Sequence, residues 1–364
     1  MRLLCFIDSL GSGGAQRQML AVAKHMKQKG QEVYIAWYAD DDFYRAAFEE
    51  IEVGCIHRIT SGMHDRFRFF SEAVKEANPD TVLSFLFAQT IISSFYKLMS
   101  FGKWNLVISM RSNNEETFLS RQRKTLRPLY LSAKAIVCNS FSESEVWKKN
   151  CRYLSNKVMV IPNYIKVPTD SNERKQREIH YPLRILVAAN LCSTIKNPLN
   201  VAKAIEMLSD EERSRIKVDW YGRRTIGKRI SPVCEEVEAF IKQHNLVHSF
   251  ATHDEVHDIY SKMAGSDCIA LFSTEEGLPN TICEGMMIGK PVMMTKVSDW
   301  KKLIDGNGIV CEGTDAESIV TAVRKLISLS DQDMAAMGKA SLTLASMLFD
   351  ESIITKKWES ALWR

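Results

Sequence analysis

Two glutamates stand eight positions apart behind a hydrophobic run in the second half of the chain. Glu276 and Glu284 both lie in the segment 273–284, which follows the apolar run 268–272. Pro279 suits the first position of a helix, because its missing N–H would have no intrahelical partner there. The start of such a helix presents backbone N–H groups and a positive dipole end to an anion.

Carboxylates repel phosphate, so two of them at an anion-binding helix start need another explanation. Each carboxylate could accept hydrogen bonds from hydroxyl groups of a sugar bound beside the phosphate. A simpler interpretation is that the acidic side chains compensate the helix dipole. The residue types alone leave both interpretations open.

Strand-like and helix-like segments alternate throughout, which predicts an α/β protein with parallel sheets and crossover helices. Helices are expected after the turn 11–14 and over 230–244, 316–328 and 351–364. Strands are predicted at residues 2–8, 32–38, 81–85, 106–110, 135–138, 158–161, 183–189, 218–221, 268–272 and 291–294.

The alternating series starts afresh after a polar segment that has proline at both ends. We therefore expect an N-terminal domain over residues 1–164, a linker over 165–182 and a second domain over 183–345. Two Rossmann-like, doubly wound domains that face each other across an interdomain cleft are the simplest arrangement.

Composition excludes several classes of protein. The 364 residues are 45% hydrophobic and 25% charged, which is ordinary for a globular protein with two cores. No apolar run approaches the roughly 18 residues of a membrane helix, and the run 3–7 is too short for a secretory signal. The nine cysteines form no Cys-x-x-Cys pair, so we expect no disulfide framework or zinc ribbon and a cytoplasmic location.

Positive charge is concentrated in the first half. Residues 1–164 carry 22 Lys and Arg against 16 Asp and Glu, while the whole chain has a net charge of +4. The basic stretches 66–70, which includes three phenylalanines, and 121–127 would suit an anionic membrane surface or a phosphate-bearing partner. Solvated surface charges are the alternative interpretation. No nucleic-acid partner is expected.

The spacing of Glu276 and Glu284 resembles the Glu-x7-Glu motif of retaining glycosyltransferases of the GT-B type, specifically glycosyltransferase family 4. Further matches follow along most of the chain in the order that this family has. They are the Gly-rich loop 13–17, the Val-Ile-Pro-Asn segment 160–163, the strand and loop 185–197, the strand and glycine 219–222, and the Gly-Lys-Pro-Val segment 289–292.

The resemblance implies roles for individual residues. Glu276 would contact the transferred sugar near its reacting carbon, Lys196 would neutralise the donor diphosphate, and Glu284 would accept hydrogen bonds from the ribose. The remaining donor-binding positions that it implies are Gly13, Gly14, Asn190, Gly222, Arg223, Gly277, Leu278, Pro279, Asn280 and Thr281.

One position departs from the family pattern. Six residues before the phosphate-binding lysine the family usually has arginine, and this chain has Asn190. An amide cannot make the bidentate, charged contact that a guanidinium makes. Arg223 or Arg224 could supply the missing charge; otherwise, donor affinity would be low and a non-catalytic member of the family becomes the alternative.

On the acceptor side, residues 106–113 resemble a strand and loop that reads Ser-x-Arg in many polysaccharide-building relatives. Arg111 would then lie at the mouth of the cleft and meet an acceptor phosphate or the leaving diphosphate. A structural ion pair is the alternative role for Arg111.

The resemblance as a whole implies retaining transfer of a sugar from a UDP- or GDP-linked donor to a hydroxyl group of a glycan or lipid-linked saccharide. The setting would be biosynthesis of capsule, lipopolysaccharide or another cell-surface polysaccharide, with the protein peripheral at the inner face of the cell membrane. No divalent metal or other cofactor is expected, since Lys196, Arg223 and the helix start near Leu278 would hold the leaving diphosphate. The C-terminal helix, within about 346–364, would return to the first domain.

Two other patterns in the sequence resemble motifs of different enzyme classes. Gly11 and Gly13, with Asp40 after the second strand, resemble a dinucleotide fingerprint, which makes a nicotinamide-dependent oxidoreductase the rival function; Gln16 stands where the third glycine belongs. His253 and His257 have zinc-peptidase spacing, but aspartate follows the first histidine where glutamate is needed. A surface helix is expected there instead.

Overall fold

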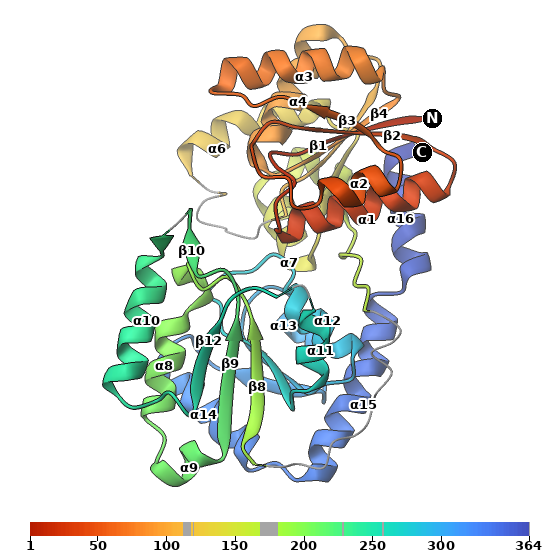
Figure 1. Cartoon of the computed structure of the whole chain (residues 1–364). Coiled ribbons are helices and arrows are strands. Elements are labelled where there is room, and N and C mark those ends of the chain that lie inside the picture. The colour runs from red at the N-terminus through yellow and green to blue at the C-terminus, as the bar shows by residue number, and fades with distance from the viewer. Residues whose placement is uncertain (112–117, 119, 168–180, 228, 257, 364) are drawn as a thin grey trace. The chain divides into compact units, whose positions relative to one another are not determined.

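The computed structural model describes residues 1–111, 118, 120–167, 181–227, 229–256 and 258–363. The chain divides into two compact units, Met1–Tyr164 with Glu351–Arg364, and Ile165–Asp350 (Figure 1). Of the linker predicted at 165–182, positions 168–180 lie outside the described residues. No helix in the described ranges is both long enough and apolar enough to span a bilayer.

The first unit is built on a seven-stranded parallel sheet in the order β3-β2-β1-β4-β5-β6-β7. Most of these strands are buried along nearly their whole length, as expected for a sheet that is covered on both faces. The strands are β1 (Arg2–Phe6), β2 (Glu32–Trp37), β3 (Gly54–His57), β4 (Thr81–Phe85), β5 (Asn105–Ser109), β6 (Ala135–Cys138) and β7 (Val158–Val160).

Helices cover both faces of this sheet. The C-terminal helix packs on it as well: Trp358 is buried 6.1 Å from Phe85 between ring centroids, and Thr81 Oγ1 donates a hydrogen bond to the Leu362 carbonyl over 3.0 Å. The helices are α1 (Gly14–Gln28), α2 (Arg45–Glu50), α3 (Met63–Ala77), α4 (Phe87–Ser100), α6 (Arg121–Leu126), η1 (Arg127–Ser132), α7 (Phe141–Asn150), η2 (Arg152–Lys157) and α16 (Glu351–Trp363).

The second unit has a six-stranded parallel sheet in the order β12-β9-β8-β13-β14-β15. Its strands are β8 (Leu183–Ala188), β9 (Ile216–Tyr221), β12 (Phe250–His253), β13 (Cys268–Leu271), β14 (Val292–Thr295) and β15 (Gly308–Cys311), and β10 (Thr225–Ile226) pairs with β11 (Arg229–Ile230) in a hairpin. Its helices are η4 (Thr194–Lys196), α8 (Pro198–Glu206), α9 (Asp210–Ser214), α10 (Pro232–Gln243), α11 (Ile259–Ala264), α12 (Asn280–Met287), α13 (Trp300–Leu303), α14 (Ala316–Ile327) and α15 (Asp331–Leu348).

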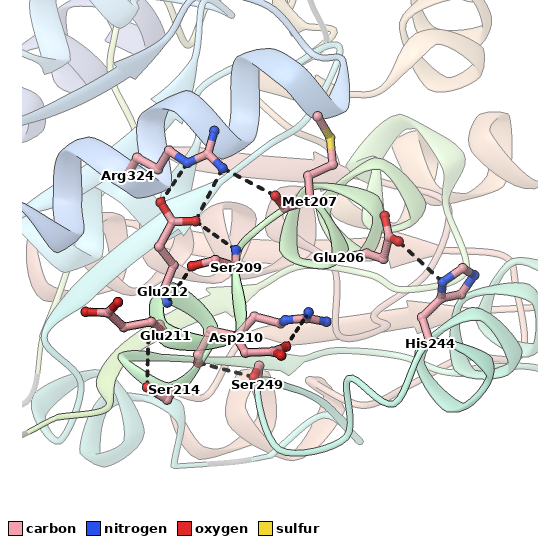
Figure 2. Close-up of polar contacts among 11 residues, drawn as sticks. Glu206, Met207, Ser209, Asp210, Glu211, Glu212, Ser214, His244, Ser249 and Arg324 are labelled. Carbon is pink, nitrogen blue, oxygen red and sulfur yellow. Dashed lines mark hydrogen bonds and ion pairs between the residues drawn. The ribbon is translucent and has the colours of Figure 1, made fainter.

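A polar network ties helices α9 and α14 together at the end of the second unit where β9 begins (Figure 2). Ser209 and Glu212 form a reciprocal capping box at the start of α9, in which each side chain accepts from the other residue's backbone N–H. Arg324 of α14 then binds Glu212, with 2.8 Å between Nε and Oε1. These side chains satisfy the first turn of α9 and anchor it.

Both sheets are doubly wound, so the α/β prediction is confirmed. In each sheet the strand order reverses beside the first strand of the unit, between β1 and β4 in one and between β8 and β13 in the other. Three short strands of these two sheets, β3, β12 and β15, were not predicted from the sequence, and neither were the two strands of the β10–β11 hairpin. Each of the first three is only partly buried, whereas the equally short strands β6, β13 and β14, which were predicted, are buried along their whole length.

Candidate functional site

Most of the donor-site residues predicted from the sequence gather at one edge of the second sheet. Strands β8 and β13 are parallel neighbours, so the loops that follow them leave the sheet side by side. This is the point where the strand order reverses, and ligands of open α/β sheets bind outside the carboxyl ends of the strands at such a point.

Lys196 and Glu276 meet at this edge. Lys196 ends the short helix η4 after β8, and Glu276 lies in the loop after β13. The Lys196 Nζ is 2.5 Å from Glu276 Oε1, and the hydroxyl of Ser273 donates to the same oxygen over 2.7 Å. Both charged side chains keep part of their surface exposed, 24% for the lysine and 13% for the glutamate. The pair is therefore accessible to a ligand.

Hydrogen bonds between loops fix this arrangement. The N–H of Thr274 donates to the Ile195 carbonyl over 2.8 Å, which ties the glutamate loop to the lysine loop. From the other side, Thr295 Oγ1 donates to the Ser273 carbonyl over 2.6 Å, and the Ser298 hydroxyl donates to the Gly277 carbonyl. The loop that carries Glu276 is thus held by its neighbours on both sides.

Helix α12 begins immediately after this loop. Pro279 is the residue before the helix rather than its first residue, which corrects the sequence prediction: its ψ of 87° is not helical, and its carbonyl accepts from the N–H groups of Ile282 and Cys283. The backbone N–H of Thr281 lies in the first turn of α12, where N–H groups have no intrahelical acceptor. The hydroxyl of Thr281 donates to the Ala188 carbonyl over 2.7 Å. Gly277, Leu278 and Asn280 flank the same position.

Glu284 lies on α12 and is only 4% exposed. The helix approaches β13 closely at the next residue, because a Cβ on Gly285 would come within 2.7 Å of the Ile269 side chain. That close approach keeps Glu284 near the sheet edge. The predicted glutamate pair therefore consists of one partly exposed carboxylate in a loop and one nearly buried carboxylate on a helix.

The loop after β9 completes the same edge. A Cβ on Gly222 would come within 1.9 Å of the Ala189 carbonyl oxygen, so only glycine allows the loops after β8 and β9 to approach this closely. The Arg223 carbonyl accepts from the Leu191 N–H over 3.0 Å. Asn190 Oδ1 accepts from the Cys192 N–H over 2.9 Å, so this amide oxygen orders its own loop.

Arg224 does not supply the charge that Asn190 lacks. Its guanidinium forms an ion pair with Glu238 at 2.5 Å and lies 3.6 Å from Asp254. The positive charge of Arg224 is therefore already paired with carboxylates of its own unit. Of the two arginines considered, Arg223 remains the candidate for a phosphate contact.

The predicted glycines of the first unit lie at the start of α1. Gly13 precedes the helix and Gly14 is its first residue. A Cβ on Gly13 would come within 2.4 Å of Gln16 Oε1. The missing side chain therefore makes room for Gln16, whose amide nitrogen donates to Asp8 over 3.2 Å.

Arg111 follows β5 in the first unit, with φ of 58°. Its guanidinium stacks 4.4 Å over the Phe85 ring and donates to Asn163 Oδ1, and its Nη1 is buried with no hydrogen-bond partner in the described part of the chain. Burial lowers the pKa of Arg111 to about 10, and the Glu143 carboxylate counteracts part of that shift. Residues 112 and 113 of the predicted loop lie outside the described residues.

The expected surface helix at residues 253–257 is wrong, because His253 is the last residue of strand β12. Its Nε2 lies 2.9 Å from Asp219 Oδ1, and its ring stacks on Tyr221 with 4.4 Å between centroids. His257 is outside the described residues. Within the described ranges, no three His, Cys, Asp or Glu side chains form a metal-binding group.

Models of two glycosyltransferase families match the chain in succession. Residues 12–167 match "Glycosyltransferase Family 4", and residues 182–329 match "Glycosyl transferases group 1". The chain belongs to glycosyltransferase family 4. This finding confirms the resemblance and removes the oxidoreductase alternative.

Solved structures share the fold of this glycosyltransferase. HepE of Anabaena, crystallised with UDP and with UDP-glucose, is 18% identical with a TM-score of 0.82, and the alignment covers 100% of this chain and 99% of HepE. A Rickettsia africae glycosyltransferase is 16% identical with a TM-score of 0.77, covering 100% and 99%. WaaG, involved in lipopolysaccharide biosynthesis, is 14% identical with a TM-score of 0.73 and full coverage of both chains. No curated protein sequence matches significantly.

The sequence alone did not identify the residues that support the site of this glycosyltransferase. Ser273, Thr295 and Ser298 position the Glu276 loop through contacts between different strands. Serine and threonine at strand ends carry no signal of such contacts. Only the positive φ of Ser298, 53°, marks an unusual position, and it is visible only in the structure.

Proposed function

We propose that this glycosyltransferase moves a sugar from a nucleotide-diphosphate sugar to an acceptor hydroxyl with retention of configuration. The contact between Lys196 and Glu276 carries the proposal, because it joins a cation for the diphosphate to a carboxylate for the sugar. UDP is the first nucleotide to test, since HepE binds UDP and UDP-glucose.

The ion pair explains how the site would work. Without donor, the Lys196 ammonium is neutralised by Glu276. A diphosphate competes for that ammonium, because charge-assisted hydrogen bonds to phosphate are strong. Glu276 then becomes available to accept a hydrogen bond from a sugar hydroxyl, while Ser273 keeps its carboxylate oriented. Donor binding thus rearranges a preformed pair of charges.

Cleavage of the bond between the anomeric carbon and the phosphate oxygen leaves negative charge on the diphosphate. Lys196, the N–H groups at the start of α12 and Arg223 would stabilise that charge where it develops. Attack of the acceptor on the same face, with the departing oxygen taking its proton, gives retention. These positive groups would do the work of a divalent metal, so we propose a metal-independent reaction; turnover that survives EDTA is the expected result.

The acceptor that we propose is a glycan or lipid-linked saccharide of cell-surface polysaccharide biosynthesis, used at the inner face of the cell membrane. The involvement of WaaG in lipopolysaccharide biosynthesis supports this setting. Arg111 would meet an anionic group of the acceptor or of the leaving diphosphate. Its Nη1, which is buried and has no hydrogen-bond partner among the described residues, supports such a contact.

A screen of nucleotide sugars by thermal unfolding tests the donor. We expect one UDP- or GDP-sugar to raise the unfolding temperature and NAD to leave it unchanged. Transfer with that donor, followed by NMR of the anomeric proton, then tests retention. Stabilisation without transfer to any acceptor would support the non-catalytic alternative, and stabilisation by none of the nucleotide sugars would contradict the proposal.

A further inference from the structure

Some residues of the two basic stretches singled out in the sequence are engaged within the first unit. Phe69 and Phe70 are buried. Arg68 pairs with Glu72 at 3.0 Å between Nε and Oε1, and Arg127 is only 6% exposed. Arg68 nevertheless keeps 72% of its side chain exposed, so the role of these stretches at an anionic surface stays a prediction.

A different part of the first unit exposes large apolar side chains. The second half of α4 and the residue that ends it carry four of them, and η1, which packs against α4, carries a fifth. We call this surface the α4 tip; it consists of Phe95, Leu98, Met99, Phe101 and Leu131. Contiguous exposed apolar groups on a folded unit mark an interaction site.

Packing of the first unit does not explain why residue 101 is a phenylalanine. It ends α4 in the left-handed conformation, with φ of 49°, and 89% of its surface is exposed. Glycine or asparagine is favoured at such a position, and α3 ends on Asn78 in that same conformation. A phenylalanine there strains the backbone and buries almost nothing. Its ring is therefore best explained by contact with something outside the unit.

Three lysines lie beside the α4 tip. Lys97 Nζ donates to the Trp104 carbonyl over 2.7 Å, and Lys157 Nζ donates to the carbonyls of Leu131 and Ala133 over 2.7 and 2.8 Å. Burial lowers the pKa of Lys97, and the charges of Lys157 and Lys134 lower it further. Within the described ranges, none of the three lysines forms an ion pair with a carboxylate.

We propose that the α4 tip docks on the surface of an anionic lipid bilayer. Phe101, Met99 and their apolar neighbours would enter the headgroup layer, and the lysines would face lipid phosphates. Mutually repelling ammonium groups that pair with no carboxylate of the described residues gain most from an anionic surface. The inference rests on the proposed function in one respect: a lipid-linked acceptor would lie in the same bilayer.

Vesicle binding tests the proposal with the full chain. We expect binding to phosphatidylglycerol vesicles, little binding to phosphatidylcholine vesicles, and a decline as salt is raised. The double variant Met99→Ser, Phe101→Gly should lose roughly tenfold or more in vesicle affinity. Because glycine relieves the left-handed conformation of residue 101, the variant should remain folded. Met347→Ser, at an exposed methionine of the second unit, is the matched control and should bind as the wild type does.

Three results would overturn the proposal: equal binding to both kinds of vesicle, unchanged affinity in the double variant, or a change of oligomeric state in that variant, which would make the α4 tip a contact between copies. Sugar transfer to a water-soluble acceptor separates this inference from the proposed function. The double variant should transfer at the wild-type rate, so loss of vesicle binding with intact transfer concerns the α4 tip alone. Absent transfer with intact vesicle binding would contradict only the proposed function.

Discussion

The ammonium of Lys196 lies 2.5 Å from Oε1 of Glu276, although 79 residues separate them in the sequence. The two residues meet because they follow neighbouring strands, β8 and β13, at the point where the strand order of the sheet reverses. Neither side chain is fully buried. The relationship is that of two opposite charges held ready for separate parts of one ligand.

Replacement of Glu276 should separate turnover from donor binding. Glu276→Gln removes the charge that competes with a diphosphate for Lys196, so we expect donor affinity to be kept or improved. Turnover should fall about 100-fold, because the carboxylate no longer faces the sugar. Single-turnover kinetics with calorimetric donor binding measures both quantities. Glu275→Gln is the control one residue away, and equal turnover in both variants would be evidence against the role of Glu276.

Gly222 should tolerate no side chain. The Cβ of Gly222→Ala would lie 1.9 Å from the Ala189 carbonyl oxygen, so one of the two loops must move. We expect the free energy of unfolding to fall by about 1–3 kcal/mol and donor binding to weaken as the loop after β8 shifts. Gly62→Ala is the control, since a Cβ there meets nothing within 4 Å. Unchanged donor binding in Gly222→Ala would show that this loop contact does not position the site.

The capping box of α9 should contribute to stability without affecting catalysis. Ser209→Ala leaves the Glu212 N–H without its side-chain acceptor (Figure 2). Such caps contribute about 1 kcal/mol, so thermal unfolding should begin at a lower temperature. The rate of transfer per folded molecule should stay unchanged. A loss of turnover at a temperature where the variant is folded would link this network to the site.

Arg111 should give stability a specific pH dependence. Burial lowers its pKa to about 10 in the folded state, while the unfolded chain keeps the proton to about pH 12.5 or above. Between these values the unfolded state binds more protons, so this residue makes stability increase with pH. The unfolding temperature of the wild type relative to Arg111→Met should therefore rise from about pH 9 to about pH 11. A difference that stays constant or falls would show that Arg111 is not desolvated.

Much of the fold could be predicted because both sheets are covered on two faces. Buried parallel strands are continuous apolar runs, and residues 81–85 and 135–138 were assigned with the bounds that the structure has. Strand β12 was not predicted, and its last residue, His253, was assigned to a surface helix over 253–257 because of its spacing from His257. The histidine spacing there reflects a strand end and the loop that follows it.

The candidate site was less predictable in its supporting contacts. The family motif picked out Lys196 and Glu276, and the structure places them together. Ser273 and Thr295 hold the glutamate loop through hydrogen bonds that depend on which strands are neighbours. No local pattern encodes that neighbourhood. The pairing of Arg224 with Glu238 likewise depends on tertiary structure, and it removes one of the two arginines that could have replaced the missing charge.

Calorimetric titration of UDP and GDP into the wild type and Lys196→Ala tests the central claim most directly, with Lys203→Ala, an exposed lysine of the same unit, as control. We predict that one of the two nucleotides binds the wild type and the control with equal affinity. Binding to Lys196→Ala should be weaker by about 10- to 100-fold, the loss expected for a charge-assisted hydrogen bond to phosphate. Equal affinity in all three proteins, or no binding of either nucleotide to the wild type, would contradict the account.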